Sequence, residues 1–331
     1  MSPSRFPVGS PAPGPLPRRS EADVVARWSA DRPLVSVLCT THQHVEHIED
    51  AIRGFLGQDT EFPFEIIIRD DASTDGTADI VRDYAERYPL IIRPVLEQVN
   101  RWPATSPLQI IHGMARGELL AICEGDDYWS APDKLARQAA LLLEDEAAIA
   151  SHHDAVVAED GIVTLSHEVP ESRRRDLSMA ELRLTPYLPF RTLMMRRSAL
   201  AFLDDIDRRA WFVFHVDKLV TNHLGTLGHS RFLPGEGLAV YRKHAGGLES
   251  GRGKLTRKGR SGMSSFWIAV HLTEQGHAAD GQRQLVTAAE KFAESGLVER
   301  RDPVLWLGLR LVRSALIRRL QGLRARLGRG A

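Results

Sequence analysis

Apolar and polar positions alternate in blocks along the first half of the chain, and these blocks predict strands and helices in turn. Continuous apolar runs, which are typical of strands buried in a parallel sheet, occupy residues 34–40, 64–69, 90–96 and 118–123. Between these runs the apolar residues recur at helical spacing, which predicts helices at residues 45–57, 75–87 and 106–116. The alternation predicts an α/β fold with a Rossmann-like, mostly parallel sheet and helices on both faces.

The second half of the chain has a less regular pattern. A helix is predicted at residues 132–143, and short strands are predicted at residues 147–151, 153–158, 161–166, 230–233 and 238–242. A further helix is predicted at residues 216–224. The polar stretch at residues 168–176 is interpreted as a solvated loop, and contact with a phosphate or an acceptor through its arginines is the alternative.

Composition divides the chain into four regions. Residues 1–30 begin with a proline-rich stretch that has too few apolar residues to fold, which predicts a disordered arm. Residues 31–250 form the predicted α/β domain. Residues 251–262 are rich in glycine and basic residues and predict a flexible linker. Residues 263–331 carry amphipathic segments, at 264–275, 282–295 and 303–327, and predict a C-terminal helical extension.

The last of these segments, residues 303–327, is basic as well as amphipathic. It carries Trp306 and a row of leucines among arginines, and no acidic residue follows Asp302. A helix of this kind can lie in the interface of an anionic membrane. The alternatives are that its apolar stripe packs on the preceding helices or on a second copy of the chain in a homodimer.

Charge and cysteine content limit the classes of protein that fit. The 331 residues include 43 basic and 43 acidic side chains, so the balance of charge argues against a nucleic-acid partner. The two cysteines, Cys39 and Cys123, end apolar runs and are expected to be reduced core residues. The sequence has no apolar run long enough for a membrane span and no signal core at its start. We therefore expect a cytoplasmic protein, with peripheral attachment to the inner face of the cytoplasmic membrane through residues 303–327 as an alternative.

Polar clusters follow three of the predicted strands at their carboxyl ends. They are Thr40-Thr41-His42, Asp70-Asp71 and Glu124-Gly125-Asp126-Asp127. Ligands of open α/β sheets bind beyond these strand ends, so the clusters are expected to converge. Clustered carboxylates offer the oxygen ligands that Mg²⁺ or Mn²⁺ takes, and such ions commonly also bind substrate phosphates. The alternative is a solvated acidic turn at the start of the helix that Pro132 begins.

The blocks at these strand ends resemble those of the family 2 glycosyltransferases of the GT-A fold. The matching residues are Val35 to Gln43, the Asp70-Asp71-Ala72-Ser73-Thr74-Asp75-Gly76-Thr77 block, Ala115 to Glu118 and Glu124 to Trp129. Their order and spacing cover residues 34–145, with a weaker similarity up to Tyr241-Arg242-Lys243-His244. The chain departs from the family pattern at His42 and Gln43, where Tyr-Asn is common, and at Glu124, where Asp is more usual.

The resemblance implies roles for particular residues. Thr40 and Asp71 would bind the nucleotide base, with Thr41 and His42 beside them and Arg101 as the candidate arginine after the third strand. Asp126 and Asp127 would form the metal site of the DXD type. Asp127 is the expected direct ligand of the Mn²⁺ or Mg²⁺ ion, whereas Asp126 is expected nearer the ribose or sugar. Glu124 would support this site.

The resemblance also implies a catalytic base and a further group near the diphosphate. Inverting transfer of a sugar needs a base that takes the proton of the acceptor hydroxyl. Asp217 stands where the family supplies this base, at the start of the predicted helix 216–224, although it could be an ordinary helix N-terminal carboxylate. His244, supported by Arg242, would donate to the diphosphate or complete the metal shell, whereas a lone histidine of this kind is often structural.

The sequence therefore predicts an inverting, metal-dependent glycosyltransferase. Its donor would be a nucleoside-diphosphate sugar, with a UDP-sugar as the first choice, and its acceptor a glycan, a lipid-linked sugar or a protein. One alternative is a catalytically inactive GT-A-like subunit that binds sugar or acts as a scaffold. Another is a sugar nucleotidylyltransferase, which is disfavoured because the first strand is followed by Thr-Thr-His-Gln-His without the expected glycines.

Overall fold

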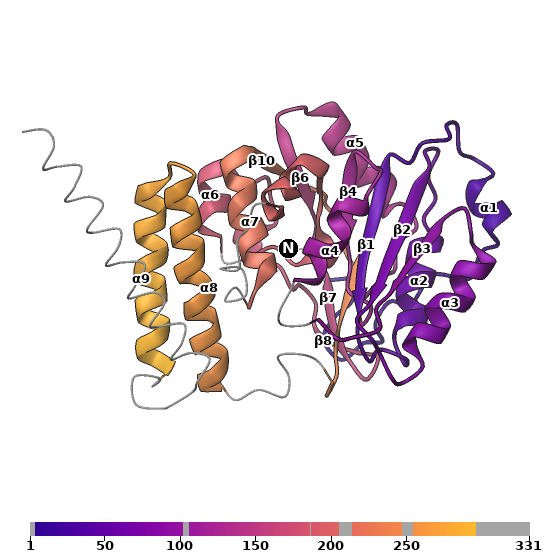
Figure 1. The fold of residues 1–331 in the computed structure, drawn as a ribbon, viewed down its shortest axis with the longest axis horizontal. Coiled ribbons are helices and arrows are strands. Elements are labelled where there is room, and N and C mark those ends of the chain that lie inside the picture. Colours follow the sequence, from indigo (N-terminus) through magenta and orange to yellow (C-terminus); the bar gives the residue numbers. More distant parts are fainter. Residues whose placement is uncertain (1–3, 102–105, 186, 205–213, 247–253, 296–331) are drawn as a thin grey trace, which may run out of the picture. The chain divides into compact units, whose positions relative to one another are not determined.

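The computed structural model describes residues 4–101, 106–185, 187–204, 214–246 and 254–295. The chain divides into two compact units, which are shown in Figure 1. One unit comprises Met1–Trp211 with Val216–Gly251, and the other comprises Phe212–His215 with Arg252–Ala331. The first unit contains the strands and nearly all of the residues that the sequence analysis marks as functional.

A seven-stranded sheet forms the centre of the first unit, with the strand order β10-β6-β9-β4-β1-β2-β3. Its strands are β1 (Val35–Thr41), β2 (Phe64–Asp70), β3 (Ile92–Leu96), β4 (Leu119–Ile122), β6 (Ala148–His152), β9 (Met194–Arg196) and β10 (His229–Phe232). β1 pairs in parallel with both β2 and β4, and β6 pairs in parallel with β10. β9 is antiparallel to β4 and to β6, so the sheet is mixed but mostly parallel, as the alternation in the sequence predicts.

A smaller four-stranded sheet has the order β5-β11-β7-β8. Its strands are β5 (Tyr128–Trp129), β7 (Val156–Glu159), β8 (Ile162–Leu165) and β11 (Ala239–Lys243). β11 is antiparallel to β5 and parallel to β7. Because β5 comes directly after the acidic cluster and β11 leads to His244, this sheet brings two distant parts of the chain to one place.

Helices cover both faces of the large sheet (Figure 1). Those of the first unit are α1 (Glu21–Val25), α2 (Ile48–Leu56), α3 (Thr77–Arg87), α4 (Pro107–Ile111), α5 (Lys134–Glu144), α6 (Met179–Leu184) and α7 (Val216–Leu227). Short 3₁₀ segments are His112–Met114, Glu171–Arg173, Phe190–Thr192 and Arg197–Leu203. The second unit contains α8 (Lys254–Glu274) and α9 (Ala278–Ser295).

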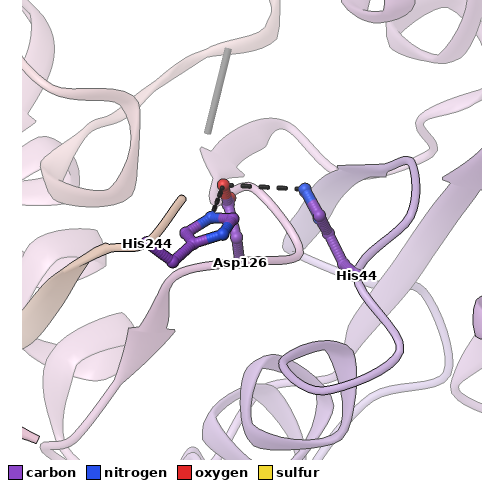
Figure 2. Close-up of side chains that lie close together, drawn as sticks. All are labelled: His44, Asp126 and His244. Atoms are coloured by element: carbon purple, nitrogen blue, oxygen red, sulfur yellow. Dashed lines mark hydrogen bonds and ion pairs between the residues drawn. The ribbon is translucent and has the colours of Figure 1, made fainter. Parts of the chain in front are cut away.

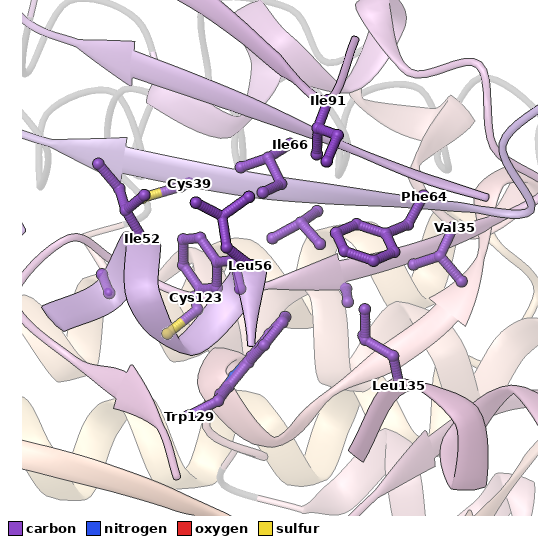
Figure 3. Close-up of a cluster of buried hydrophobic side chains, with 14 of the residues drawn as sticks. Val35, Cys39, Ile52, Leu56, Phe64, Ile66, Ile91, Cys123, Trp129 and Leu135 are labelled. Atoms are coloured by element: carbon purple, nitrogen blue, oxygen red, sulfur yellow. The ribbon is translucent and has the colours of Figure 1, made fainter. Parts of the chain in front are cut away.

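The side chains of the large sheet alternate between two apolar cores, as the period of a strand requires. In β1, Val35, Val37 and Cys39 pack in the core that includes α2, α3 and α5 (Figure 3). Leu38 points to the opposite core, which includes α4, α6 and α7. Both faces of the sheet are therefore buried, which explains why its strands are continuous apolar runs in the sequence. Cys39 and Cys123 are free and buried in the first of these cores.

The N-terminal arm differs from the expectation of disorder for residues 1–30. Among the described residues 4–30, Leu16 is buried, and its backbone oxygen accepts a hydrogen bond from Arg53 Nε at 3.0 Å. Pro13 O accepts a hydrogen bond from the Tyr128 hydroxyl at 2.7 Å, and Gly9 N donates to Val163 O at 2.9 Å. Proline prevents regular structure but not docking, so an extended arm can be ordered by contacts with a folded domain.

The structure also differs from the prediction of a flexible linker at residues 251–262, because α8 begins at Lys254 and runs to Glu274. Gly262 has a packing role within the second unit. A Cβ atom at Gly262 would lie 3.0 Å from Cδ1 of Phe292 in α9, so glycine permits the two helices to approach closely. The predicted segments 264–275 and 282–295 fall in α8 and α9, whereas the basic helix at 303–327 lies outside the described residues. Within the described part of the chain, no helix has the length and apolar character needed to cross a membrane.

Candidate functional site

The candidate site lies at the carboxyl ends of β1 and β4, where the order of the parallel strands reverses. The chain adds β2 and β3 on one side of β1 and then returns to β4 on the other side. The turn after β4 lies against the end of β1, since Gly125 N donates a hydrogen bond to Thr40 O at 2.9 Å. A Cβ atom at Gly125 would lie 2.7 Å from Oγ1 of Thr41, so only glycine fits this approach without displacement. Such a reversal point is the usual ligand crevice of an open α/β sheet.

Asp126 lies at these strand ends between two histidines from distant parts of the chain (Figure 2). Its Oδ2 atom is 3.2 Å from Nε2 of His244, which follows β11, and 3.6 Å from Nε2 of His44, which follows β1. The three donor atoms lie within 4.8 Å of one another. This group offers one oxygen and two nitrogen ligands, and it could hold a divalent metal ion.

Asp127 has different surroundings, although it is the next residue in the chain. Its carboxylate is buried, with Oδ2 accepting from Nη1 of Arg191 at 2.8 Å and Oδ1 from the backbone N–H of Arg242 at 2.9 Å. The expectation that Asp127 is the direct metal ligand stays a prediction, since a carboxylate oxygen that accepts one hydrogen bond keeps a second lone pair. Both of its oxygens already have partners, whereas Asp126 is the carboxylate that faces His44 and His244.

Arg242 supports this arrangement from β11. Its guanidinium donates to Oδ2 of Asp50 at 2.7 Å and lies over the ring of Tyr128, with Cζ 4.8 Å from the ring centroid. Since the Arg242 backbone also holds Asp127, one residue links β11, α2 and the acidic turn. The supporting role of Arg242 in a metal or diphosphate site stays a prediction.

Arg191 is a central residue of the site that sequence reasoning missed. Besides Asp127, it contacts Glu168, whose Oε2 accepts from Nε at 3.1 Å, and it lies over the Tyr241 ring at 4.1 Å from Cζ. Burial lowers the pKa of the guanidinium, but Asp127 and Glu168 outweigh this effect and hold the pKa above its usual value. No local motif marks Arg191, because its two partners are 64 and 23 residues away.

Two further carboxyl groups have pKa values near neutrality. Burial raises the pKa of Asp217, in the first turn of α7, to about 6, although the Lys218 N–H, which donates to Oδ1 at 2.8 Å, and the charge of Arg191 oppose the rise. Burial also raises the pKa of Glu124 to about 7. The negative charge of Asp217 also raises the pKa of Glu124, and the negative charge of Glu168 also raises the pKa of Asp217. These carboxyl groups therefore share one electrostatic environment.

Asp71 lies at the end of β2, on the other side of β1 from the acidic turn. Its Oδ1 atom accepts hydrogen bonds from Nη2 of Arg69 at 2.7 Å and from the backbone N–H of Arg101 at 2.9 Å. The Arg101 side chain turns instead to Glu97, with Nε 3.1 Å from Oε2. Arg101 therefore belongs to this part of the site through its backbone.

The loops after β1 and β2 hold each other in place. Gln43 N donates to Oγ of Ser73 at 2.9 Å, and Thr74 N donates to Oε1 of Gln43 at 2.9 Å. Gln43 and Ala72 both have left-handed backbone angles, φ 58° and 57°, which are strained for residues other than glycine and often occur at functional sites. His42 is exposed on this rim, with Nε2 3.2 Å from Nδ2 of Asn100.

The structure thus brings the expected residues together in two groups beside β1. Thr40, Thr41, His42, Asp71 and Arg101 lie around the ends of β1 and β2, and Glu124, Asp126, Asp127, Asp217, Arg242 and His244 lie around the end of β4. The buried Thr41 hydroxyl has no hydrogen-bond partner among the described residues. This hydroxyl is packed against Gly125, where a Cβ atom would lie 2.7 Å from it, so it belongs to the close contact between the end of β1 and the acidic turn.

Comparison with known proteins identifies the family. Residues 36–203 match the family model described as glycosyl transferase family 2, so the chain belongs to that family. The uncharacterized protein Rv1520 of Mycobacterium tuberculosis is 39% identical over 215 residues, which are 65% of this chain and 60% of that protein. The match therefore spans less than two thirds of that relative. The putative teichuronic acid biosynthesis glycosyltransferase TuaG of Bacillus subtilis is 33% identical over 130 residues, 39% of this chain and 50% of TuaG.

Solved structures confirm the predicted GT-A architecture. Staphylococcus aureus TarS in complex with UDP-GlcNAc has a TM-score of 0.59 and 18% identity, covering 81% of this chain and 74% of that one. The mannosyltransferase PcManGT from Pyrobaculum calidifontis, in complex with GDP-Man and Mn²⁺, has a TM-score of 0.53 and 20% identity, covering 96% of this chain and 84% of that one. At sequence identities this low, the structural similarity is evidence for the fold alone.

Proposed function

We propose that this protein transfers a sugar from a nucleoside-diphosphate sugar to a glycan, lipid-linked or protein acceptor with inversion, and that it requires a divalent metal ion. One observation carries the proposal. Asp126 and its two histidine neighbours lie at the strand-end crevice of a family 2 fold, and Asp217, a carboxyl group poised to ionise near neutral pH, shares the electrostatic environment of the same acidic turn. Sugar transfer from a nucleoside-diphosphate sugar needs a cation that neutralises the diphosphate and a base that takes the acceptor's proton, and these two groups of residues would supply both.

The residues present fit a divalent metal ion. Nitrogen and oxygen atoms of His244 and Asp126 lie 3.2 Å apart, and both side chains are partly exposed, so an ion bound there could also contact a substrate. When bound, Mn²⁺ or Mg²⁺ would neutralise negative charge on the departing diphosphate, which removes the need for a general acid. Asp127 would act indirectly, since its hydrogen bonds to Arg191 and Arg242 fix the turn that carries Asp126.

The other group of residues would bind the nucleoside. A carboxylate such as Asp71 can accept a hydrogen bond from a ring N–H of a base, and Thr40, which is partly exposed at the end of β1, offers a hydroxyl that can donate or accept. Arg69 and the Arg101 N–H already hold the Asp71 carboxylate in one orientation, so it is positioned before a ligand arrives. Uracil offers a suitable ring N–H, and the TarS complex holds UDP-GlcNAc, so a UDP-sugar is the first candidate donor.

Asp217 would be the base that takes the proton of the acceptor hydroxyl. With a pKa of about 6 it is mostly ionised at pH 7, yet it is more basic than an ordinary aspartate. Attack by the acceptor on the face of the sugar opposite the diphosphate inverts the anomeric centre, and one base is sufficient for this displacement. Arg191 has an orienting role, because it links Asp127 and Glu168 close to Asp217.

Release of nucleoside diphosphate from a panel of UDP-sugars with Mn²⁺ tests the proposal, with water acting as a slow acceptor. Asp217→Asn should reduce the release at least about a hundredfold, because general base catalysis contributes this much. Asp145→Asn is the matched control, since Asp145 pairs with His229 and Arg231. If Asp217→Asn released nucleoside diphosphate as fast as Asp145→Asn and the wild type, the role of Asp217 as base would be contradicted. If the wild type neither bound nor turned over any donor, the proposed transferase activity would be contradicted.

A further inference from the structure

We infer that His44 is a third protein ligand of the metal ion, and that the set of His44, Asp126 and His244 makes this site prefer transition-metal ions to Mg²⁺. This inference rests on the proposed function and deepens it. The sequence predicts a carboxylate site with His244 as an additional ligand, and such a site accepts Mg²⁺ and Mn²⁺ alike. Two imidazole ligands with one carboxylate would change that preference.

The geometry of the three side chains supports coordination by all of them. The two Nε2 atoms lie 3.2 and 3.6 Å from the same oxygen of Asp126. Ligands about 2.0–2.2 Å from one ion have neighbours roughly 3 Å away, so these separations are close to those of adjacent ligands. The rings of His44 and His244 are nearly perpendicular, with an interplanar angle of 85°, and they approach Asp126 from different directions (Figure 2).

Hydrogen bonding alone does not explain the position of His44. A separation of 3.6 Å is too long for a hydrogen bond between its Nε2 and Asp126 Oδ2. Nε2 is the ring nitrogen that faces Asp126, whereas the buried Nδ1 atom has no hydrogen-bond partner among the described residues. A cation bound between the three side chains would use both Nε2 lone pairs and the carboxylate charge together.

The chain holds His44 in this position through its backbone. His44 N donates to Oγ1 of Thr77 at 2.9 Å, and Val45 N donates to Oδ2 of Asp75 at 3.0 Å, which fixes the loop after β1 to the start of α3. On the other side, the ring of His47 packs edge-on against His244 at a centroid distance of 4.6 Å. The side chains of His44 and Asp126 are 15% and 20% exposed, so the group is enclosed but still open to a ligand.

The donor atoms decide which ion binds best. Mg²⁺ prefers oxygen ligands, whereas imidazole favours later transition metals, and affinity for mixed nitrogen and oxygen sites rises from Mn²⁺ through Co²⁺ to Ni²⁺. Two histidines with one carboxylate on one side of an ion are also a common site for Fe²⁺, with the remaining positions open. We therefore expect Mg²⁺ to bind more weakly than Mn²⁺, and Mn²⁺ more weakly than Co²⁺.

Calorimetric titration of the untagged full chain with MgCl₂, MnCl₂ and CoCl₂, each with and without UDP, tests this inference. His44→Ala should weaken Mn²⁺ and Co²⁺ binding by more than about tenfold, since even the loss of a residue that only orients a metal ligand costs that much. His44→Asp should keep a metal site but lower the ratio of Co²⁺ affinity to Mg²⁺ affinity. His229→Ala is the matched control, because His229 also pairs with an aspartate, at 2.9 Å from Asp145, and should leave all affinities unchanged.

The visible absorption of bound Co²⁺ gives a second readout, which should change in His44→Ala and His44→Asp but not in His229→Ala. Circular dichroism of each variant establishes that the fold is intact, and His44→Asn replaces His44→Ala if the latter does not fold. Equal affinities for wild type and His44→Ala would overturn the inference, as would Mg²⁺ binding as tightly as Co²⁺. If metals bind as expected but UDP binds in no condition, the proposed function fails and the inference stands. If UDP binding requires metal but neither UDP nor metal binding depends on His44, the inference fails and the proposed function stands.

Discussion

The buried ion pairs of Arg191 lead to a quantitative prediction about stability. Its side chain is 9% exposed and lies between Asp127, whose side chain is 3% exposed, and Glu168, at 7%. Arg191→Met keeps much of the packing volume but leaves two buried carboxyl groups without their cation. Removal of one partner from a buried pair costs about 3–5 kcal/mol, so the free energy of unfolding should fall by about this amount.

Urea unfolding at pH 7.5, followed by circular dichroism, measures this loss. Arg231→Met is the matched control, because Arg231 also bridges two carboxylates, Asp145 and Asp176, but its side chain is 30% exposed. Exposed pairs of this kind contribute at most about 1 kcal/mol. If the two variants lost equal amounts of unfolding free energy, the claim that burial makes the Arg191 ion pairs more important for stability would be refuted.

The pH dependence of the same loss provides an independent check. Burial already raises the pKa of Asp127, and without Arg191 this pKa should rise further. A carboxyl group whose pKa is higher in the folded state than in the unfolded state destabilises the fold as pH rises through the folded value. The stability deficit of Arg191→Met should therefore shrink as pH is lowered from 8 towards 5. A deficit that stays constant over this range would contradict the explanation.

Three further predictions concern the crevice itself. The rate of transfer by the wild type should fall about tenfold per pH unit below about 6, as Asp217 becomes protonated, and Asp217→Asn should give a low rate without this decline in a pH profile. Gly125→Ala places a Cβ atom 2.7 Å from Oγ1 of Thr41 and should lower the free energy of unfolding by about 1–3 kcal/mol in a urea titration. Asp71→Asn removes a charge-assisted acceptor and should weaken UDP binding by about tenfold or more in calorimetry.

Local sequence patterns predict the large sheet because each buried strand is apolar along its whole length. β1, β2 and β4 lie within a residue or two of the predicted ranges, and their carboxyl ends carry the predicted polar clusters. The family signal reinforces this pattern, because its blocks occur in the same strand ends. This part of the fold depends on neighbours in sequence, which a periodic pattern records.

Contacts between distant residues were the part that the sequence did not reveal. Arg191 contacts Asp127 from the segment just before β9, 64 residues along the chain, and His44 faces Asp126 from the loop after β1. No local pattern records either contact. Composition predicted disorder for residues 1–30 and a flexible linker for residues 251–262, and the described residues in both segments are ordered by contacts. Pro13 accepts a hydrogen bond from Tyr128, and Gly262 packs against Phe292, so proline and glycine mark docking and close helix packing there.

The central claim is that the crevice binds a nucleoside diphosphate with a metal ion held by Asp126. Calorimetry with UDP, GDP, CDP and dTDP, with and without Mn²⁺, on wild type and Asp126→Asn tests it most directly. We expect one nucleotide, UDP first, to bind only when Mn²⁺ is present, and Asp126→Asn to abolish that binding while its circular dichroism is unchanged. Failure of all four nucleotides to bind the wild type with Mn²⁺, or equal binding by Asp126→Asn, would contradict the account.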